Sequence, residues 1–308
     1  MNKVKDFLGK NTALVGLIVL MLIITIIDIN FIQISNLSNV LRQVSINGLI
    51  ALGMTFVILT GGIDLSVGSI FALTGAVLTK MLLSGVDPVI AIILTLVLGG
   101  LLGLVNGILI SYGKLQAFIA TLGTMTLFRG ITRVFMDGRP ITGFKSDLVN
   151  EIGRGYLLGI PIPTIILIFA IIIVSFVLKK TIFGKEVYAV GGNETAARFS
   201  AININKVKIK VYTISGFLTT IASIILASRL NSTQPNAGMG YELDAIAAVV
   251  LGGTSLAGGR GRVFGTVVGI LIIGFLNNGL NILGVTSFYQ DVVKGVVILL
   301  AVLIDRKK

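Results

Sequence analysis

The chain contains no cysteine, no histidine and no tryptophan, and only 12% of its 308 residues are charged. Without cysteine there is no disulfide and no thiolate, and without histidine there is no imidazole to bind a metal. Catalytic pairs of the Ser-His or Cys-His type are excluded for the same reason. These absences remove most enzyme classes, and the sequence predicts no metal site and no cofactor.

Two further catalytic patterns fail. The phosphate-binding pattern GxxxxGK[ST] does not occur in the sequence, so any ATP hydrolysis has to come from another protein. The stretch GTSLA at 253–257 superficially resembles the nucleophile elbow of hydrolases, but that elbow acts through a histidine, which the chain lacks. A chain that performs no covalent chemistry itself is therefore expected.

Apolar residues dominate the composition. They make up 55% of the chain, and the mean hydropathy is +1.00, which is far more apolar surface than one soluble core can bury. We therefore expect an all-α integral membrane protein in contact with the lipid bilayer. The net charge of +12 does not indicate a nucleic acid partner, because the 25 Lys and Arg residues cluster between the apolar runs and not in one patch.

About ten transmembrane helices are predicted, since roughly 20 helical residues cross a hydrocarbon core of about 30 Å. The chain is treated as a single transmembrane domain over 1–308. The ten apolar runs are 12–29, 38–60, 63–83, 87–110, 116–136, 161–179, 208–230, 242–257, 263–283 and 288–304.

Basic residues between the runs predict the orientation. The first run follows three lysines, as in a signal peptide, but no small-residue cleavage site comes after it, so it is predicted to be an uncleaved span. With both termini in the cytoplasm, the inside segments are the basic ones. These include Lys114, the segment 179–210, Arg260 with Arg262, and 306–308. The predicted outer loop at 137–160 is nearly neutral.

One interruption of the apolar pattern occurs twice. LTGGIDLSVGS at 59–69 and LGGTSLAGG at 251–259 share the spelling GGxxLxxG, with Gly61 and Gly62 matching Gly252 and Gly253. Paired breaks in two related halves are typical of transporters whose substrate path lies at the repeat interface. Glycine pairs that only allow close helix packing would give the same spelling. The first break fits either a cytoplasmic turn or a break at mid-membrane depth.

Several long blocks resemble the ribose-type permeases of bacterial ABC importers. They are GMTFVILTGGIDLSVGSIFALTGAV (53–77), QAFIATL (116–122), YAVGGNETAARFSAININKVKIKVY (188–212), GYELDAIAAVVLGGTSLAGGRGRVFGT (240–266) and GFLNNGLNILGV (274–285). The resemblance implies a permease subunit of the bacterial plasma (inner) membrane that dimerises, with homodimers expected. It also implies an extracytoplasmic sugar-binding protein that delivers substrate and a separate ABC ATPase subunit that drives transport.

Asp64 is an unusual residue for an apolar segment, because an isolated carboxylate in hydrocarbon costs roughly 3 kcal/mol on insertion scales. Three roles are open. Asp64 or Ser66 caps the amides at the start of the next helix, Asp64 lines the substrate path and bonds sugar hydroxyls, or Asp64 pairs with an intramembrane base such as Arg129. Ser66 is likewise a candidate for the substrate path.

Asparagines offer the neutral donors and acceptors that an uncharged sugar needs. Asn277, Asn278 and Asn281 lie within about one helical turn, and Asn106 lies in an earlier run. Each is a candidate for the substrate path. Hydrogen bonding between helices is the alternative, since it is common for asparagine in membranes.

A cytoplasmic coupling loop is expected at about 180–207. Within it, Asn193 is a plausible N-cap, followed by Glu194 in the first helical turn. By the resemblance, the coupling helix that docks on the ATPase includes Asn193, Glu194, Thr195, Arg198 and Phe199. A short amphipathic helix resting on the membrane surface is the alternative.

Two acidic residues, Glu242 and Asp244, open a predicted span, where they favour the helix dipole and cap free amides. The preceding outer loop, 231–240, is a candidate contact for the binding protein.

The sequence therefore predicts the permease subunit of an ABC importer that carries a neutral monosaccharide, most simply ribose, into the cytoplasm. A permease for branched-chain amino acids or another small solute is the alternative, although the charges that would bind a zwitterion are scarce. An ion-coupled secondary transporter and a membrane scaffold are further alternatives. The coupling loop argues against the secondary transporter, and the repeated break argues against the scaffold.

Overall fold

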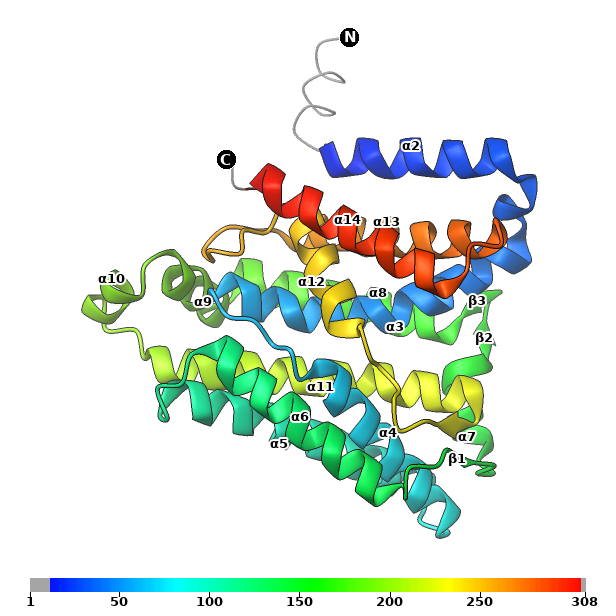
Figure 1. Ribbon diagram of the computed structural model, residues 1–308. Helices are drawn as coiled ribbons and strands as arrows, with labels where there is room; N and C mark the ends of the chain where they lie inside the picture. Colours follow the sequence, from blue (N-terminus) through cyan, green and yellow to red (C-terminus); the bar gives the residue numbers. More distant parts are fainter. Residues whose placement is uncertain (1–11, 306–308) are drawn as a thin grey trace.

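A computed structural model describes residues 12–305, and its regular structure is almost entirely helical (Figure 1). The helices keep the labels of Figure 1. They are α2 (Thr12–Ile27), the short 3-10 helix η1 (Ile29–Ile32), α3 (Ile34–Leu59), α4 (Val67–Leu83), α5 (Pro88–Ser111), α6 (Ala117–Phe135), α7 (Asp147–Arg154), α8 (Ile162–Lys180), α9 (Ile182–Gly192), α10 (Glu194–Phe199), α11 (Ile204–Leu230), α12 (Tyr241–Leu251), α13 (Val263–Ile282) and α14 (Ser287–Asp305).

Four two-residue strands add two small antiparallel ladders, which the sequence did not predict. They are β1 (Ile141–Thr142), β2 (Tyr156–Leu157), β3 (Ile160–Pro161) and β4 (Ser232–Thr233). In the first ladder Ile141 is paired with Thr233, so the loop after α6 is bonded to the loop after α11. The other ladder is a hairpin of β2 and β3. The expectation of an all-α chain is otherwise confirmed.

Each of the ten predicted runs overlaps one helix, but two boundaries were wrong. The run 63–83 was expected to be helical throughout, whereas α4 begins at Val67. The run 242–257 was expected to be one span, whereas α12 ends at Leu251 after 11 residues. Gly253 has φ of +83°, a conformation that glycine adopts without steric cost and that ends the helix. Helix α12 is thus shorter than a membrane crossing requires, whereas α4, with 17 residues, is at the lower limit.

Five of the described helices are long and apolar enough to cross a bilayer, namely α3, α5, α8, α11 and α13. They differ in where their side chains face. Most of α3 and α11 is buried inside the bundle, whereas α5 and α8 direct most side chains outward. The outward residues of α5 and α8 are apolar, for example Ile93, Val97, Ile168 and Ile172. Exposed apolar faces of this extent are stable in lipid and not in water, so the chain is a multi-pass membrane protein.

Glycines allow a close helix contact between α5 and α11. Gly99, Gly103 and Gly107 recur every four residues on one face of α5. A Cβ atom on Gly103 would overlap the carbonyl oxygen of Tyr212 on α11, and one on Gly216 of α11 would overlap the carbonyl oxygen of Gly99. The two backbones touch, as small residues at fourth positions allow in membrane helices.

The bundle has two different ends (Figure 1). Helices α9 and α10 project from one end, where α2 also begins and α14 ends, and the strands and α7 lie at the other. Helices α3 and α12 run in the same direction: Asn47 lies 3.5 Å from Asp244 near the start of α12, and Gly259 beyond its end bonds Leu59 at the end of α3. The two glycine breaks therefore meet at the α9–α10 end.

Candidate functional site

The first break is held by a buried polar network around Asp64. Its side chain is fully buried, and Oδ1 accepts hydrogen bonds from the backbone amide of Ser66 (3.0 Å) and from the Ser66 hydroxyl (2.6 Å). The Ser215 hydroxyl of α11 donates to Oδ2 over 3.0 Å. Asp64 thus bonds the residue that precedes α4 and bonds α11 at the same time. It does not cap the first turn of α4, because the N-cap residue of that helix is Ser66 and no side chain makes a capping hydrogen bond there.

The network continues into α5 and α6. The Asn106 amide donates to the Ser66 hydroxyl (2.7 Å), and the Thr124 hydroxyl donates to Asn106 Oδ1 (2.6 Å). Asn106 and Ser66 are fully buried and Thr124 nearly so. Sequence reasoning missed Ser215 and Thr124, because single hydroxyls carry no signal in an apolar helix.

Arg129 does not pair with Asp64, so that alternative was wrong. Its guanidinium donates to three backbone carbonyls: Gly68 (2.9 Å), Pro235 (2.9 Å) and Ala237 (2.8 Å). Gly68 lies in the first turn of α4, and the other two carbonyls belong to the loop before α12. Arginine suits this task because its planar fork carries five donors. One side chain of α6 therefore joins the starts of two short helices.

The starts of α4 and α12 are in contact, and each has a carboxylate beside it. Gly238 and Gly68 approach so closely that a side chain on either would meet the other's backbone. At α12, Glu242 accepts a hydrogen bond from the amide of Gly240 over 3.2 Å, and Asp64 does the same for Ser66 at α4. Negative groups at two converging helix N-termini offset the partial positive charge there. Asp244, the other predicted acid, instead forms an ion pair of 3.4 Å with Lys294 of α14.

The three asparagines of α13 have different surroundings. Asn278 and Asn36 of α3 exchange two amide hydrogen bonds of 2.9 and 3.0 Å, so Asn278 joins two helices. The Asn281 side chain accepts from Gln290 of α14 over 2.8 Å. The Oδ1 atom of Asn277 is buried without a hydrogen-bond partner among the described residues.

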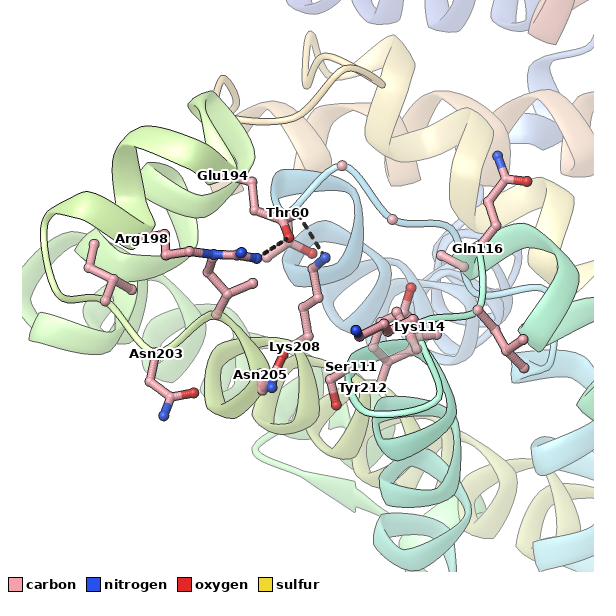
Figure 2. Close-up of a pocket in the computed structure, with 17 residues that line it drawn as sticks. Thr60, Ser111, Lys114, Gln116, Glu194, Arg198, Asn203, Asn205, Lys208 and Tyr212 are labelled. Atoms are coloured by element: carbon pink, nitrogen blue, oxygen red, sulfur yellow. Dashed lines mark hydrogen bonds and ion pairs between the residues drawn. The ribbon is translucent and has the colours of Figure 1, made fainter.

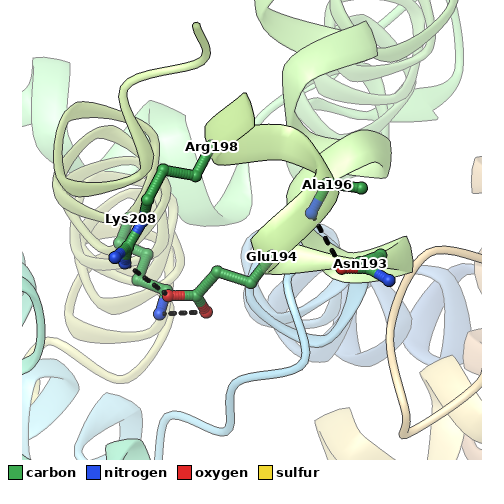
Figure 3. A network of polar contacts seen from close by, with 5 residues as sticks. All are labelled: Asn193, Glu194, Ala196, Arg198 and Lys208. Carbon is green, nitrogen blue, oxygen red and sulfur yellow. Dashed lines mark hydrogen bonds and ion pairs between the residues drawn. The ribbon is translucent and has the colours of Figure 1, made fainter. Parts of the chain in front are cut away.

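The predicted coupling segment forms two helices, α9 and α10, of which α9 was not expected. Asn193 lies between them and its side chain accepts from the amide of Ala196 over 2.9 Å, so it caps α10 as predicted (Figure 3). Glu194 bonds Lys208 of α11 at 2.8 Å, and Arg198 lies 4.0 Å from the same carboxylate. Thr195 is exposed, and Phe199 at the tip is 87% exposed. An apolar ring so far from the bundle is suited to insertion into a partner.

A groove of about 930 Å³ separates α10 from the ends of α5 and α6 (Figure 2). Gly61 and Gly62 of the first break lie along it, together with Lys114, Glu194 and Lys208. The groove therefore connects the coupling segment with the break.

The same two segments also meet through backbone alone, at a contact that we call the glycine junction (Leu59, Gly61, Gly191, Gly258 and Gly259). The amide of Gly259 donates to the carbonyl of Leu59 over 2.9 Å. A Cβ atom on Gly191, near the end of α9, would overlap that carbonyl oxygen, and one on Gly258 would lie 2.8 Å from the amide of Gly61. Three chain segments thus touch without intervening side chains.

A smaller cavity of about 270 Å³ lies at the other end, beside the loop 231–240. Phe71 and Tyr241 form its aromatic side in an edge-to-face pair with ring centres 5.2 Å apart. Gln234 and Asn236 of the loop contribute exposed amides.

Comparison with known proteins identifies the family of this chain. The family model described as branched-chain amino acid transport system / permease component matches residues 36–302. The chain belongs to this permease family. A ribose import permease protein of Bacillus subtilis is 59% identical over 294 residues, covering 95% of this chain and 91% of the relative. The ribose import permease protein of Escherichia coli K12 is 52% identical over 307 residues, covering 99% and 96%.

A D-allose transport system permease protein of Escherichia coli K12 is also similar, with 44% identity over 277 residues, or 90% of this chain and 85% of the relative. No solved structure gives a significant match.

Proposed function

We propose that the chain is the permease subunit of an ABC importer that carries ribose into the cytoplasm. The similarity to two ribose import permeases, at 59% and 52% identity over nearly the whole chain, carries this proposal. The relative named for D-allose is less similar, at 44%. A sugar is also favoured over a branched-chain amino acid, although the family description names the latter, because each of these relatives is named for a sugar.

The proposed complex contains two copies of this chain, an ABC ATPase and an extracytoplasmic sugar-binding protein. The exposed α10, with Phe199 at its tip, supports docking of the ATPase at the α9–α10 end. The loop 231–240 lies at the opposite end and is proposed to receive the binding protein. This arrangement puts ten membrane segments, of which α12 is too short for a full crossing, as one domain over 1–308 in the bacterial inner membrane with both termini in the cytoplasm. Helix α10, the start of α2 and the end of α14 lie at the same end of the bundle (Figure 1), which supports the same side of the membrane for all three.

Alternating access is the proposed mechanism. ATP binding to the partner would move α9 and α10, and the glycine junction would pass that movement to both breaks because no flexible side chain lies between the segments. Gly61, Gly62, Gly252 and Gly253 are the proposed hinges. In this scheme Asp64, Ser66 and Asn106 hold the closed break and meet substrate only when α4 moves away from α5 and α6. Asn277, Asn278 and Asn281 are proposed to serve the path near the outer end.

Reconstitution tests the function directly. The chain is placed in vesicles with its ATPase and binding protein, and uptake of labelled ribose is followed with and without ATP. ATP-dependent uptake that unlabelled ribose abolishes and unlabelled leucine leaves unchanged is expected. Uptake without the ATPase, driven by a proton or sodium gradient, would show a secondary transporter instead.

A further inference from the structure

The groove beside α10 has an excess of positive charge. Seventeen residues line it, of which three are cationic (Lys114, Arg198 and Lys208) and one is acidic (Glu194). Figure 2 shows the three cations reaching the groove from the turn after α5, from α10 and from α11. Hydroxyl and amide groups of Thr60, Ser111, Gln116, Asn203 and Asn205 occupy much of the remaining wall. This lining has the chemistry of an anion site.

The cations of the groove are unequally neutralised. Lys208 and Arg198 share the carboxylate of Glu194, at 2.8 and 4.0 Å, whereas Lys114 forms no ion pair within residues 12–305. Lys114 also has a left-handed backbone, with φ of +53°. Such a position favours glycine or asparagine, so a lysine there is not explained by the turn itself. Its ammonium group is available for an external anion.

The wall of the groove on the α5–α6 side continues into an apolar surface. Leu115, which lines the groove, is 44% exposed, and Tyr112, Phe118 and Ile119 beside it are 62%, 47% and 55% exposed. Tyr112 and Leu115 lie in the turn between α5 and α6, and Phe118 and Ile119 lie in the first turn of α6. A ligand that carries both an anionic group and an apolar chain therefore fits the groove and its rim together.

We propose that the groove binds the phosphate group of an anionic phospholipid, with Lys114 as its main contact. Basic pockets between membrane helices on the cytoplasmic side recognise such headgroups, and the apolar rim would receive the acyl chains. Glu194 competes with the lipid for Lys208 and Arg198, so occupancy loosens the bond between α10 and α11. The inference depends on the cytoplasmic placement of α10 given under the proposed function.

Lipid binding to the purified full chain tests the proposal. The chain is held in neutral detergent, phosphatidylglycerol or phosphatidylcholine is titrated, and bound lipid is counted by native mass spectrometry. Wild type is expected to bind phosphatidylglycerol at least about tenfold more tightly than phosphatidylcholine. Lys114→Gln should weaken phosphatidylglycerol binding about fivefold, and Glu194→Gln should strengthen it. The matched controls are Lys185→Gln and Glu186→Gln, which make the same charge changes on α9 outside the groove and should leave binding unchanged.

Three results would overturn the proposal: equal binding of the two lipids, the same loss in Lys185→Gln as in Lys114→Gln, or displacement of the lipid by millimolar inorganic phosphate. The last would identify a site for a free anion. An unchanged elution volume and thermal midpoint verify that each variant is folded. The assay contains no nucleotide, sugar or partner, so its outcome and that of the transport assay are independent.

Discussion

The backbone amide of Gly259 donates a hydrogen bond to the carbonyl of Leu59, and the α-carbon of Gly191 packs against the same carbonyl. Two helix breaks 191 residues apart in sequence and the segment proposed to dock the ATPase are thereby in direct backbone contact. A movement of α9 relative to α3 requires this contact to slide or to open. In the proposed mechanism, ATP binding to the partner ATPase would act on both breaks through this junction.

Replacing Gly191 with alanine tests the junction. The new methyl group overlaps the carbonyl of Leu59, and overpacking of this kind costs about 1–3 kcal/mol. A lower thermal midpoint in detergent and loss of ATP-driven uptake are expected. Gly192→Ala is the matched control, because a Cβ atom there meets no atom within 4 Å. Similar behaviour of the two variants would contradict the role of the junction.

Asp64 is expected to tolerate asparagine better than leucine. Asparagine keeps an oxygen for the amide of Ser66, whereas leucine leaves that amide and the Ser215 hydroxyl without their acceptor. Each buried group left unsatisfied costs about 1–3 kcal/mol. The thermal midpoint of Asp64→Asn should lie close to that of the wild type, and the midpoint of Asp64→Leu should lie well below both. If leucine leaves both stability and uptake unchanged, Asp64 has neither a structural role nor a role in the path.

Replacing Arg129 with either methionine or lysine should lower the thermal midpoint. Methionine removes all three hydrogen bonds to carbonyls, and bonds from a charged donor are worth about 1.5–3 kcal/mol each. Lysine keeps the charge but lacks the planar fork, so an intermediate thermal midpoint is expected. The control is Arg133→Met, since Arg133 is exposed and makes one such bond, to Asn236. An equal effect of Arg129→Met and Arg133→Met would refute the joining role.

Reversing the charge of Arg198 separates docking from folding. Its side chain is 75% exposed and its ion pair with Glu194 is long, at 4.0 Å, so Arg198→Glu should change stability by less than about 1 kcal/mol. ATP-driven ribose uptake is expected to fall to background, with normal membrane insertion. Lys145→Glu reverses an exposed positive charge in the loop between α6 and α7, away from the coupling segment, and should retain uptake. Normal uptake by Arg198→Glu would count against docking through α10.

The reciprocal pair of Asn36 and Asn278 is suited to a double-mutant cycle. Each single change to leucine leaves one amide without its two bonds, whereas the double variant removes both amides. The coupling between the two sites is expected to be about 0.6 kcal/mol, the average for hydrogen bonds between membrane helices. Purely additive losses in unfolding free energy would mean that the amide pair does not hold α3 to α13.

Local features were predictable from sequence and long-range ones were not. Runs of about 20 apolar residues marked the helices, because a run of that length has few other uses. The Asn193 cap was also predictable, since the cap and the amide it bonds are three residues apart. The short helix α9 was missed because its sequence, IFGKEVYAVGG, mixes charges with glycines and is too short for a span.

The arrangement of the two breaks depends on tertiary contacts. Arg129 is 61 residues from Gly68 and 108 from Ala237. Nothing in the sequence of α6 indicates that this arginine donates hydrogen bonds to backbone carbonyls. The glycines of both breaks were recognised, but α4 begins six residues after Gly61 and α13 eleven after Gly252. The same glycine motif is thus followed by loops of different length, because each loop is shaped by the segment packed against it.

The glycine contact between α5 and α11 restricts the route of the sugar. With Gly103 against Tyr212 and Gly216 against Gly99, the two helices leave no room for a pentose ring between them. Helices α5 and α11 therefore act as one closed side of the bundle, and separating them would expose the backbone at their contact. The route must therefore run along other faces of the bundle.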